Sequence, residues 1–403
     1  MKINFIKLLV VFCCFSIFSC TKETKETIII TEENSTIVEN GDGLTEEDLV
    51  EWDKLEVVDV NVNNILLPNG STIGVYKTSL GKSDAGQQEN SNKIISKLCE
   101  SAGAIITYKP NLYIGIPTQT KLVYVYGDKR GVKYQYREYK TRRQGLYCPE
   151  SLYGLDCSAL LYNIFREAGF TSMPYTYADA QRKLPFLENE FKRHNNTINY
   201  NGSTINFDNI VIKERGKLAG TSLATGDIIY WKSGNAAYHI GMIVVEQTTT
   251  GKRMMIAASN GSPKDCSGNL LPKRGPNFYE IQPTGSPLIG FSKNYSVIRI
   301  SEKVPCNAKT ISGGFGVTPT LHSVGSMSGT IQLNYEMYSI PDKLEVFYEG
   351  KLLFSTNGFV SGNKSESIVY EYNDSTKTEE IEVIVTGDNA GTAWEYTVNC
   401  PQK

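Results

Sequence analysis

The stretch of sequence that decides the fold is Gly154-Leu155-Asp156-Cys157-Ser158, which runs directly into Ala159-Leu160-Leu161-Tyr162-Asn163-Ile164-Phe165-Arg166-Glu167-Ala168-Gly169. The apolar residues of the second part recur at helical spacing, and Gly169 is a natural stop signal. Asp156 stands where an N-cap residue is expected. The pattern therefore predicts a helix with Cys157 in its first turn.

A cysteine at that position has a chemical consequence. Unpaired backbone N–H groups and the positive end of the helix dipole favour an anion there. The thiol of Cys157 is thus expected to lose its proton more readily and to become a better nucleophile. The alternative is a buried or disulfide-bonded cysteine whose helix happens to start at this residue. The local sequence leaves both readings open.

The segments that follow this helix have strand patterns. Gly226-Asp227-Ile228-Ile229-Tyr230-Trp231 indicates a turn and a buried strand, and His239–Glu246 indicates a second strand. A hairpin turn over 247–252 leads to a third strand over 253–259, and 295–300 has the pattern of a closing strand. One helix followed by an antiparallel sheet is typical of an α+β domain.

A cysteine hydrolase needs a base or ion-pair partner for its thiolate. The chain has three histidines, His194, His239 and His322. His194 lies in a polar loop and His322 lies in the C-terminal segment. His239 opens a strand with an apolar body, which makes it the candidate partner of Cys157. A purely structural histidine is the alternative.

Three motifs, around Asp156-Cys157-Ser158, Gly226-Asp227 and His239-Ile240-Gly241-Met242, resemble in order and spacing those of the NlpC-type cell-wall cysteine peptidases. The resemblance covers roughly residues 140–303. It implies a papain-like α+β fold without a cofactor. It also implies hydrolysis of amide bonds in peptidoglycan stem peptides, typically next to γ-linked D-glutamate.

Carried over by position, the resemblance makes Cys157 the nucleophile and His239 the base, with Asp156 and Ser158 lining the substrate site. Many members place a polar residue, often histidine, in the next strand, and that position falls near Ala257. We therefore expect Asn260, or alternatively Ser259, to orient His239. A backbone carbonyl or a water is a further alternative.

The start of the chain has the features of an export signal. A basic beginning and an apolar run over 8–18 lead to Ile17-Phe18-Ser19-Cys20, which resembles the bacterial lipoprotein box. The apolar run is too short to cross a bilayer comfortably. This predicts a lipoprotein signal peptide over 1–19, lipid attachment at Cys20 and a flexible tether over 20–46. The alternative is an ordinary secreted protein. The protein is expected in the bacterial cell envelope, on a periplasmic, outer-membrane or surface face.

Two further regions flank the expected peptidase domain. Residues 47–139 mix strand-like and helix-like patterns, have no assigned role, and form either a separate small domain or an extension of the peptidase. Residues 305–403 show short strand patterns between turn residues, which predicts an all-β sandwich. This module is expected to bind glycan or protein, or to be an inert spacer.

The remaining cysteines fit an oxidising compartment. Cys306 and Cys400 bracket the C-terminal segment, so a disulfide between them is plausible. If Cys157 stays reduced for chemistry, Cys99, Cys148 and Cys266 leave one cysteine over, and the sequence does not say which.

Charge and motifs narrow the possible functions. The formal net charge is −2, and no basic stripe is apparent, which argues against a nucleic-acid partner. Neither an H-E-x-x-H motif nor a cysteine pair at zinc spacing occurs, so no metal is implied. Besides the endopeptidase, the sequence leaves open an amidase or toxin-like hydrolase on the same fold. It also leaves open a catalytically degenerate protein that binds the cell wall.

Overall fold

In the computed structural model the chain divides into two units, Met1–Ile37 and Val38–Lys403. All residues that the structure describes belong to the second unit. The described residues are 55–80, 89–107, 137–140, 147–152, 157–170, 198–216, 222–233, 236–260, 275–281, 295–312, 316–371, 378–389 and 391–402. The expected signal peptide, the tether and the strand pattern at 121–127 lie outside them.

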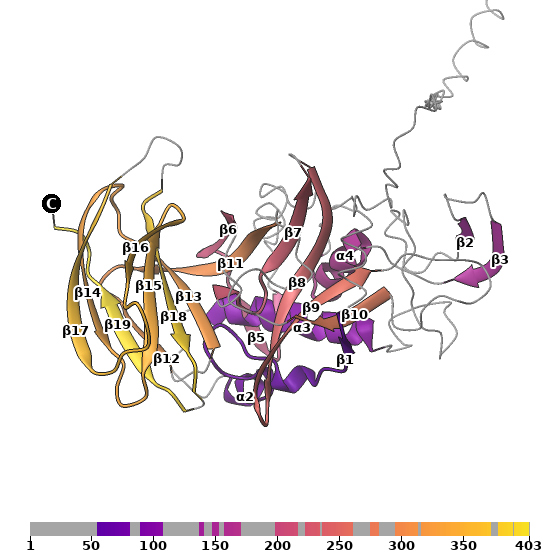
Figure 1. Ribbon diagram of the computed structural model, residues 1–403, viewed down its shortest axis with the longest axis horizontal. Helices are drawn as coiled ribbons and strands as arrows, with labels where there is room; N and C mark the ends of the chain where they lie inside the picture. The colour runs from indigo at the N-terminus through magenta and orange to yellow at the C-terminus, as the bar shows by residue number, and fades with distance from the viewer. Residues whose placement is uncertain are drawn as a thin grey trace, which may run out of the picture. The chain divides into compact units, whose positions relative to one another are not determined.

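The dominant element is an eleven-stranded sheet that runs through the described part of the chain (Figure 1). Its strand order is β1-β10-β9-β8-β7-β11-β13-β18-β15-β16, and β6 pairs with β11 beside this path. The pairs from β1 to β11 are antiparallel, whereas β11 and β13 are parallel. The strands are β1 (Val57–Val58), β6 (Ile210–Gly216), β7 (Ile228–Ser233), β8 (Ala236–Thr248), β9 (Gly251–Asn260), β10 (Gly275–Glu280), β11 (Tyr295–Pro305), β13 (Gly316–Ser323), β15 (Asp342–Tyr348), β16 (Lys351–Ser355) and β18 (Glu380–Gly387).

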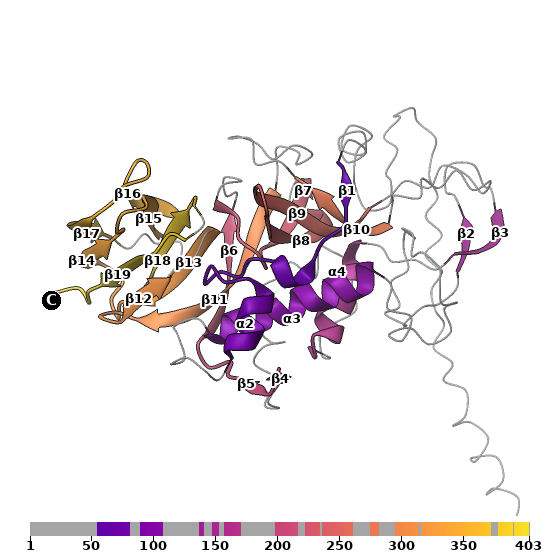
Figure 2. The same cartoon turned by 90° about the horizontal axis from the view of Figure 1, so that it is seen from below.

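Helices cover one face of this sheet. Figure 2 shows α3 (Glu89–Ile106) and α4 (Cys157–Glu167) side by side against the strands. α4 contacts α3, β8 and β9, and α3 also contacts β10 and β11. Both helices are amphipathic, because their apolar residues recur every three to four positions and form one buried stripe. The helix expected to have Cys157 in its first turn is present, with Cys157 as its first residue.

The described residues 55–80 and 89–107 belong to the same core as the segment expected to form the peptidase domain. β1 pairs with β10 at one edge of the sheet. The short helix α2 (Ile73–Ser79) and the 3₁₀ turn at Val62–Asn64 pack with α3, and Ile65, Ile73 and Ile94 join Cys157 in one buried cluster. Of the two alternatives for this region, the described residues 55–80 and 89–107 form an extension of the peptidase fold.

The two faces of the sheet have separate apolar clusters. Ile240, Met242 and Val244 of β8 pack in the cluster that contains Cys157. The alternating residues Ile243 and Val245 belong to a second cluster, on the opposite face. This separation follows from the period of two along a strand, which sends successive side chains to opposite faces.

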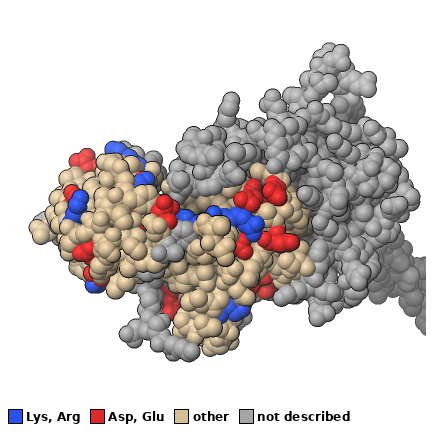
Figure 3. Space-filling model, turned by 60° about the horizontal axis from the view of Figure 1, so that its bottom comes forward, with Lys and Arg blue, Asp and Glu red and all other residues tan. Residues whose placement is uncertain are grey.

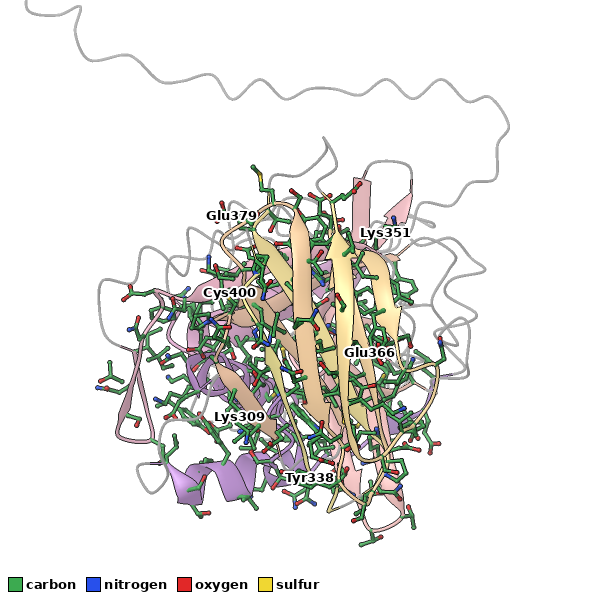
Figure 4. All side chains as sticks on the ribbon, turned by 90° about the vertical axis from the view of Figure 1, so that its left-hand side faces the viewer. Lys309, Tyr338, Lys351, Glu366, Glu379 and Cys400 are labelled. Carbon is green, nitrogen blue, oxygen red and sulfur yellow. A yellow bond between two sulfur atoms is a disulfide. The ribbon has the colours of Figure 1, made fainter. Side chains whose placement is uncertain are left out.

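The C-terminal segment forms two sheets around a third cluster. β13, β18, β15 and β16 provide one of them, and their buried residues pack against those of a four-stranded sheet. A disulfide joins Cys306 to Cys400, the pair that brackets this segment. Figure 4 looks at this module and labels Cys400. The second sheet has the order β12-β19-β14-β17, with β12 (Lys309–Ser312), β19 (Trp394–Val398), β14 (Gly329–Glu336) and β17 (Asn363–Tyr370).

The expected boundary between the peptidase and the C-terminal module falls within one strand. β11 pairs with β7 and β6 over residues 295–302 and with β13 over residues 303–305. A continuous strand thus passes from one part into the other, which explains why the large sheet continues without a break into the C-terminal module.

Strands dominate the described residues, so the α+β description applies only in part. Two short hairpins complete the fold: β2 (Arg137–Lys140) with β3 (Tyr147–Leu152), and β4 (Ile198–Tyr200) with β5 (Ser203–Ile205). Within the described ranges, no helix is long and apolar enough to span a bilayer. On the face drawn in Figure 3, acidic and basic side chains lie near one another on a mostly neutral surface.

His322 connects the two C-terminal sheets from inside. It lies in β13, is 0 % exposed, and its Nε2 is 2.9 Å from the hydroxyl of Tyr396 in β19. The two rings meet edge to face. Burial lowers the pKa of His322 to about 3. This histidine is therefore a core residue of the C-terminal module.

We expect His322 to make this module sensitive to acid. Its folded-state pKa lies below its unfolded value of about 6.5, so the stabilising effect of the neutral ring is complete above pH 6.5 and is lost as the pH falls toward 3. The loss amounts to at most about 5 kcal/mol. Burial also raises the pKa of Asp342 to about 6, which acts in the opposite direction. The test therefore compares wild type with His322→Gln.

The measurement is urea unfolding of both proteins between pH 7.5 and 4. The free energy of unfolding of wild type should fall relative to that of His322→Gln as the pH decreases. Parallel pH profiles would contradict the role assigned to this residue.

Candidate active site

Cys157 is the first residue of α4, as the sequence predicted. Its side chain is 4 % exposed, carries a thiol, and packs in the cluster between the helices and the sheet. Ser158, expected to line the substrate site, is also buried, at 3 % exposure. Asp156 lies outside the described residues. The structure thus places the candidate nucleophile at a helix N-terminus that is pressed against β8 and β9.

The other end of α4 is closed as expected. Gly169 has a φ of +101°, a conformation that disfavours residues with a Cβ. Its N–H donates to the carbonyl of Arg166, and the N–H of Phe170 donates to that of Phe165. The Nζ of Lys97 in α3 also donates to the carbonyl of Ala168, at 3.1 Å. These bonds cap α4 and hold it against α3.

His239 lies in β8, directly opposite Trp231 of β7. The register between these strands shifts at this point, since Lys232 pairs with Ala237 and Tyr238 is the extra residue. Such a bulge interrupts the alternation of faces, and bulges of this kind often re-aim a side chain next to an active site. Regular pairing of β8 with β7 begins at His239, directly after the bulge. The side chain of His239 lies outside the described part of the structure.

A close approach of β8 and β9 explains the glycine of the His239 motif. A Cβ on Gly241 would lie 2.7 Å from Cδ1 of Ile256 and 3.1 Å from the carbonyl oxygen of Ala257. Real Cβ atoms do not tolerate the first distance. A glycine at this position thus lets β8, which begins at Ala236 rather than at His239 as expected, pair tightly with β9.

The position at which the resemblance predicts a third catalytic residue is apolar. Ala257, where family members often have histidine, is 1 % exposed and packs in the cluster of Cys157. Ser259 is 0 % exposed and alternates in β9 with Ala257 and Met255, so it shares their face of the sheet. Asn260 ends β9 opposite Gly275, and its side chain lies outside the described part.

The Gly226-Asp227 motif positions a buried carboxylate. Asp227 is 1 % exposed and receives two hydrogen bonds from Arg299 of β11, at 2.8 Å from Nε and 2.7 Å from Nη2. Asp227 also accepts a hydrogen bond from the N–H of Ala224, and its own carbonyl accepts one from Ile243 of β8. The motif therefore ties the turn before β7 to both β8 and β11.

Carboxylates from the C-terminal module complete this charge cluster. Glu382 of β18 is 3 % exposed, pairs with Arg215 of β6, and lies 3.5 Å from Nη1 of Arg299. Burial first, and then the neighbouring charge of Arg299, lower the pKa of Arg215 to about 9. Each buried guanidinium thus depends on a nearby carboxylate.

Glu380, two residues earlier on β18, repeats this arrangement nearer to solvent. It pairs with Lys213 of β6 and lies 3.3 Å from Nζ of Lys303 in β11. Burial raises its pKa, but hydrogen bonds from Lys213 and Thr378 outweigh that effect and lower it. Four cations of β6 and β11 therefore face two carboxylates of the C-terminal module.

Sequence reasoning gave Asp227 no role and missed Arg299 and Glu382. One signal was available: Arg299 interrupts the apolar run Val297-Ile298-Arg299-Ile300 of a buried strand. A buried guanidinium requires an acidic partner. The partner's identity could not be inferred, because Glu382 lies more than eighty residues away in the chain, on a strand that β13 separates from β11 in the sheet.

Besides Cys157, the structure describes the side chains of Cys99 and of the disulfide pair Cys306–Cys400. Cys99 in α3 is a fully buried thiol whose pKa is raised by burial. Cys266 and the side chain of Cys148 lie outside the described residues. Among the described residues, no group of three or more His, Cys, Asp or Glu is arranged to hold a metal ion.

Removing the charge of Glu382 should destabilise the whole chain. In Glu382→Gln the guanidinium groups of Arg215 and Arg299 stay buried with one carboxylate fewer. Breaking a buried pair from one side costs about 3 kcal/mol or more. The free energy of unfolding, measured in urea, should fall by that amount. Glu366→Gln, on β17 of the other sheet (Figure 4), is the control and should change it by less than about 0.5 kcal/mol. Equal effects of the two substitutions would contradict the role of Glu382.

Comparison with known proteins identifies the part of the chain that contains this site. A model of the NlpC/P60 family matches residues 124–268, which include Cys157, Asp227, His239 and Ser259. No match was found among curated proteins. Among solved structures, the crystal structure of the insecticidal delta-endotoxin Cry8Ea1 from Bacillus thuringiensis is similar at 9% identity, over 43% of this chain and 42% of that one. Its TM-score of 0.15 is too low to support any argument. The family match, together with the cysteine at the start of α4, shows that the chain carries a domain of the NlpC/P60 family, whose members are in general cell-wall cysteine peptidases or amidases.

Proposed function

We propose that the protein is a lipid-anchored cysteine endopeptidase that hydrolyses amide bonds in peptidoglycan stem peptides, next to γ-D-glutamate. The observation that carries the proposal is the position of Cys157, at the N-terminus of a helix packed on the two strands that hold His239 and Ser259. The family match supports peptidoglycan as the substrate. The papain-like arrangement of helix and sheet is part of the same proposal.

In the proposed mechanism, the thiolate of Cys157 attacks the scissile carbonyl carbon while His239 holds the proton taken from the thiol. Backbone N–H groups at the start of α4 stabilise the negative charge that forms on the carbonyl oxygen. His239 then donates its proton to the leaving amine as the C–N bond breaks. A water molecule, deprotonated by His239, hydrolyses the resulting thioester and regenerates Cys157.

A polar group must hold the imidazole of His239 in its reactive orientation. Ala257 provides none, so this role falls to Ser259 or Asn260. Ser259 is favoured, because its buried side chain shares a sheet face with Ala257 and Met255, in the cluster that contains Cys157. Asp156 and Ser158 are proposed to line the substrate site.

The lipid anchor at Cys20 would place the enzyme in the bacterial cell envelope, attached by a tether over 20–46. The support is the sequence Ile17-Phe18-Ser19-Cys20 after a short apolar run. The C-terminal module would bind glycan or protein of the cell wall.

One observation favours a second candidate function. Since Ala257 leaves the third catalytic position apolar, a degenerate domain that binds stem peptides without cleaving them is the alternative. An amidase or toxin-like hydrolase would keep the catalytic pair and change the substrate.

The catalytic proposal is tested by incubating the purified chain with defined muropeptides and analysing the products by mass spectrometry. Wild type should release fragments cut next to γ-D-glutamate. Cys157→Ala should lower the rate by at least about a thousandfold, because no other group can form the thioester. The matched control is Cys99→Ala, which removes a second buried thiol from α3 and should retain activity. Equal product from wild type and Cys157→Ala would refute the nucleophile. Tight binding without product would favour the degenerate protein.

The same assay separates the two candidates for the orienting residue. Ser259→Ala should lower kcat by about tenfold to a hundredfold and shift its pH profile, whereas Asn260→Ala should have a smaller effect. The reverse order would transfer the role to Asn260. If neither substitution changes the pH profile, a backbone carbonyl or water orients His239.

The anchor is tested in bacterial cells that express the full chain. Wild type should sediment with membranes, and its N-terminal peptide should begin at Cys20 with the added mass of lipid. Cys20→Ser should appear in the soluble fraction at the same level of expression. A soluble wild-type protein would exclude the anchor.

A further inference from the structure

One face of the four-stranded sheet β12-β19-β14-β17 is mostly polar and points away from the apolar core of the C-terminal module. In β14, the buried residues from Ile331 to Tyr335 alternate with residues on the opposite face, where Asn334 is exposed. The strand register places outward-facing residues of four strands in two adjacent rows. These rows contain Glu395 and Glu336, and next to them Lys309, Thr397, Asn334 and Ser365.

Tyr338 lies just after β14 and displays its ring at this face. The residue is 46% exposed. Its φ of +43° is in the left-handed region, which a bulky residue rarely adopts. A strained backbone of this kind persists only where the surrounding contacts fix it, and such positions cluster at binding sites. The exposed ring of Tyr338 is therefore held in place at a cost in backbone strain.

Hydrogen bonds fix both the backbone and the ring of Tyr338. Its N–H donates to a carboxylate oxygen of Glu336 at 2.8 Å, and its carbonyl accepts from the N–H of Gly362 at 3.1 Å. Its hydroxyl donates to Glu395, which is also paired with Lys309 at 2.7 Å. The bond to Glu395 raises the pKa of Tyr338, and the bond from Lys309 lowers the pKa of Glu395. Figure 4 labels Tyr338 and Lys309 on this module.

The polar groups near the ring include both donors and acceptors. The amide oxygen of Asn334 accepts from the hydroxyl of Ser365 at 2.6 Å, which leaves its NH₂ group as a donor at the surface. Glu336 and Glu395 provide acceptors, and Lys309, 52% exposed, is a charged donor. A sugar hydroxyl is both donor and acceptor, so it matches such a mixed set. The rigid ring of Tyr338 adds an apolar plate on which the C–H face of a pyranose can pack.

The same face is poorly suited to other large partners. Lys309, Glu336 and Glu395 give the surroundings of the ring an excess of one negative charge, which does not attract the phosphates of a nucleic acid. The large exposed apolar residues of the sheet, Ile311 and Val369, lie on its two outermost strands, β12 and β17. A protein interface instead requires a contiguous apolar centre. The chemistry of this face therefore favours an uncharged partner that is rich in hydroxyl groups.

We propose that the outer face of this sheet, at Tyr338, binds an uncharged glycan chain of β-1,4-linked pyranose rings. One sugar ring stacks on Tyr338 while its hydroxyls bond to Glu336 and Glu395, and the neighbouring sugar bonds to Asn334. The choice of a β-1,4-linked chain rests on the proposed function, because the glycan strands of peptidoglycan are linked in this way. The match to the NlpC/P60 family ends at residue 268, so this site lies outside it.

Such a site would serve the peptidase without taking part in its chemistry. Tyr338 and Cys157 belong to one chain, so a glycan held at Tyr338 raises the effective concentration of the attached stem peptides at the catalytic part. The gain applies to long glycan strands that reach both sites. It does not apply to small soluble muropeptides.

The test titrates two β-1,4-linked tetramers calorimetrically into the full chain. Chitotetraose is an uncharged glycan without a stem peptide, and tetraglucuronate carries a carboxylate on each ring. Chitotetraose should bind with a Kd below about 1 mM, and tetraglucuronate should bind at least tenfold more weakly, because its carboxylates meet those of Glu336 and Glu395. No binding of chitotetraose, or equal binding of tetraglucuronate, would overturn the proposal.

Substitutions then locate the site. Tyr338→Ala should weaken chitotetraose binding at least tenfold, because the stacking surface is lost. Tyr338→Phe keeps the ring and should weaken it by less than about threefold. The matched control is Phe359→Ala, which removes a ring of similar exposure, 47%, from the same module and should bind like wild type. Unchanged binding by a folded Tyr338→Ala would refute the site.

Thermal unfolding checks that each variant folds. If Tyr338→Ala does not fold, Asn334→Ala decides, since it should weaken chitotetraose binding at least threefold and unchanged binding would count against the proposal. In the muropeptide assay, Tyr338→Ala should cleave small soluble substrates at the rate of wild type. A wild type that binds chitotetraose but cleaves no muropeptide would therefore refute the peptidase and not the glycan site, and the reverse result would refute the glycan site alone.

Discussion

The buried guanidinium of Arg299 imposes the constraint on which the rest of this structure depends. It lies in β11, the strand shared by the peptidase sheet and the C-terminal module, and is 2 % exposed. A charge that deep requires compensation, which Asp227 supplies from the turn before β7 and Glu382 from β18. Both carboxylates belong to elements that must be folded before they can reach it. The ion pairs of Arg299 with Asp227 and Glu382 therefore hold together the turn before β7, the large sheet and the C-terminal module, in addition to strand pairing.

This arrangement changes the interpretation of the C-terminal module. From its sequence it is a separate accessory unit, whereas in the structure it supplies Glu380 and Glu382 to four cations of β6 and β11. It also supplies walls of a cavity that the segment 222–225 and Val245 line from the other side. The module thus contributes to the stability of the sheet that carries β8 and β9, whatever it binds on its outer faces.

The two faces of that sheet carry different apolar clusters, and the candidate nucleophile belongs to only one of them. One face carries α3 and α4, with Cys157 between helix and strands. The other face carries a second apolar cluster and borders the same cavity. β8 contributes side chains to both apolar clusters. Its bulge at Tyr238 interrupts the alternation of faces directly before His239, the candidate base.

The sequence by itself determined the local elements and the candidate nucleophile. Helical spacing, the N-cap signal and Gly169 located α4 and its start at Cys157, and strand patterns located β7, β8, β9 and β11 but not β10, because these signals act within a few residues. The bracketing cysteines suggested the disulfide that the structure contains. Only the tertiary structure decided that residues 55–107, where described, share the peptidase core, that β11 runs into the C-terminal module, and that Glu382 neutralises Arg299. These features depend on pairing between strands and charges far apart in the chain, for which a single sequence carries no local signal. Ser259 and Asn260 were interchangeable in the sequence, and the face on which Ser259 lies became visible only once the strands were paired.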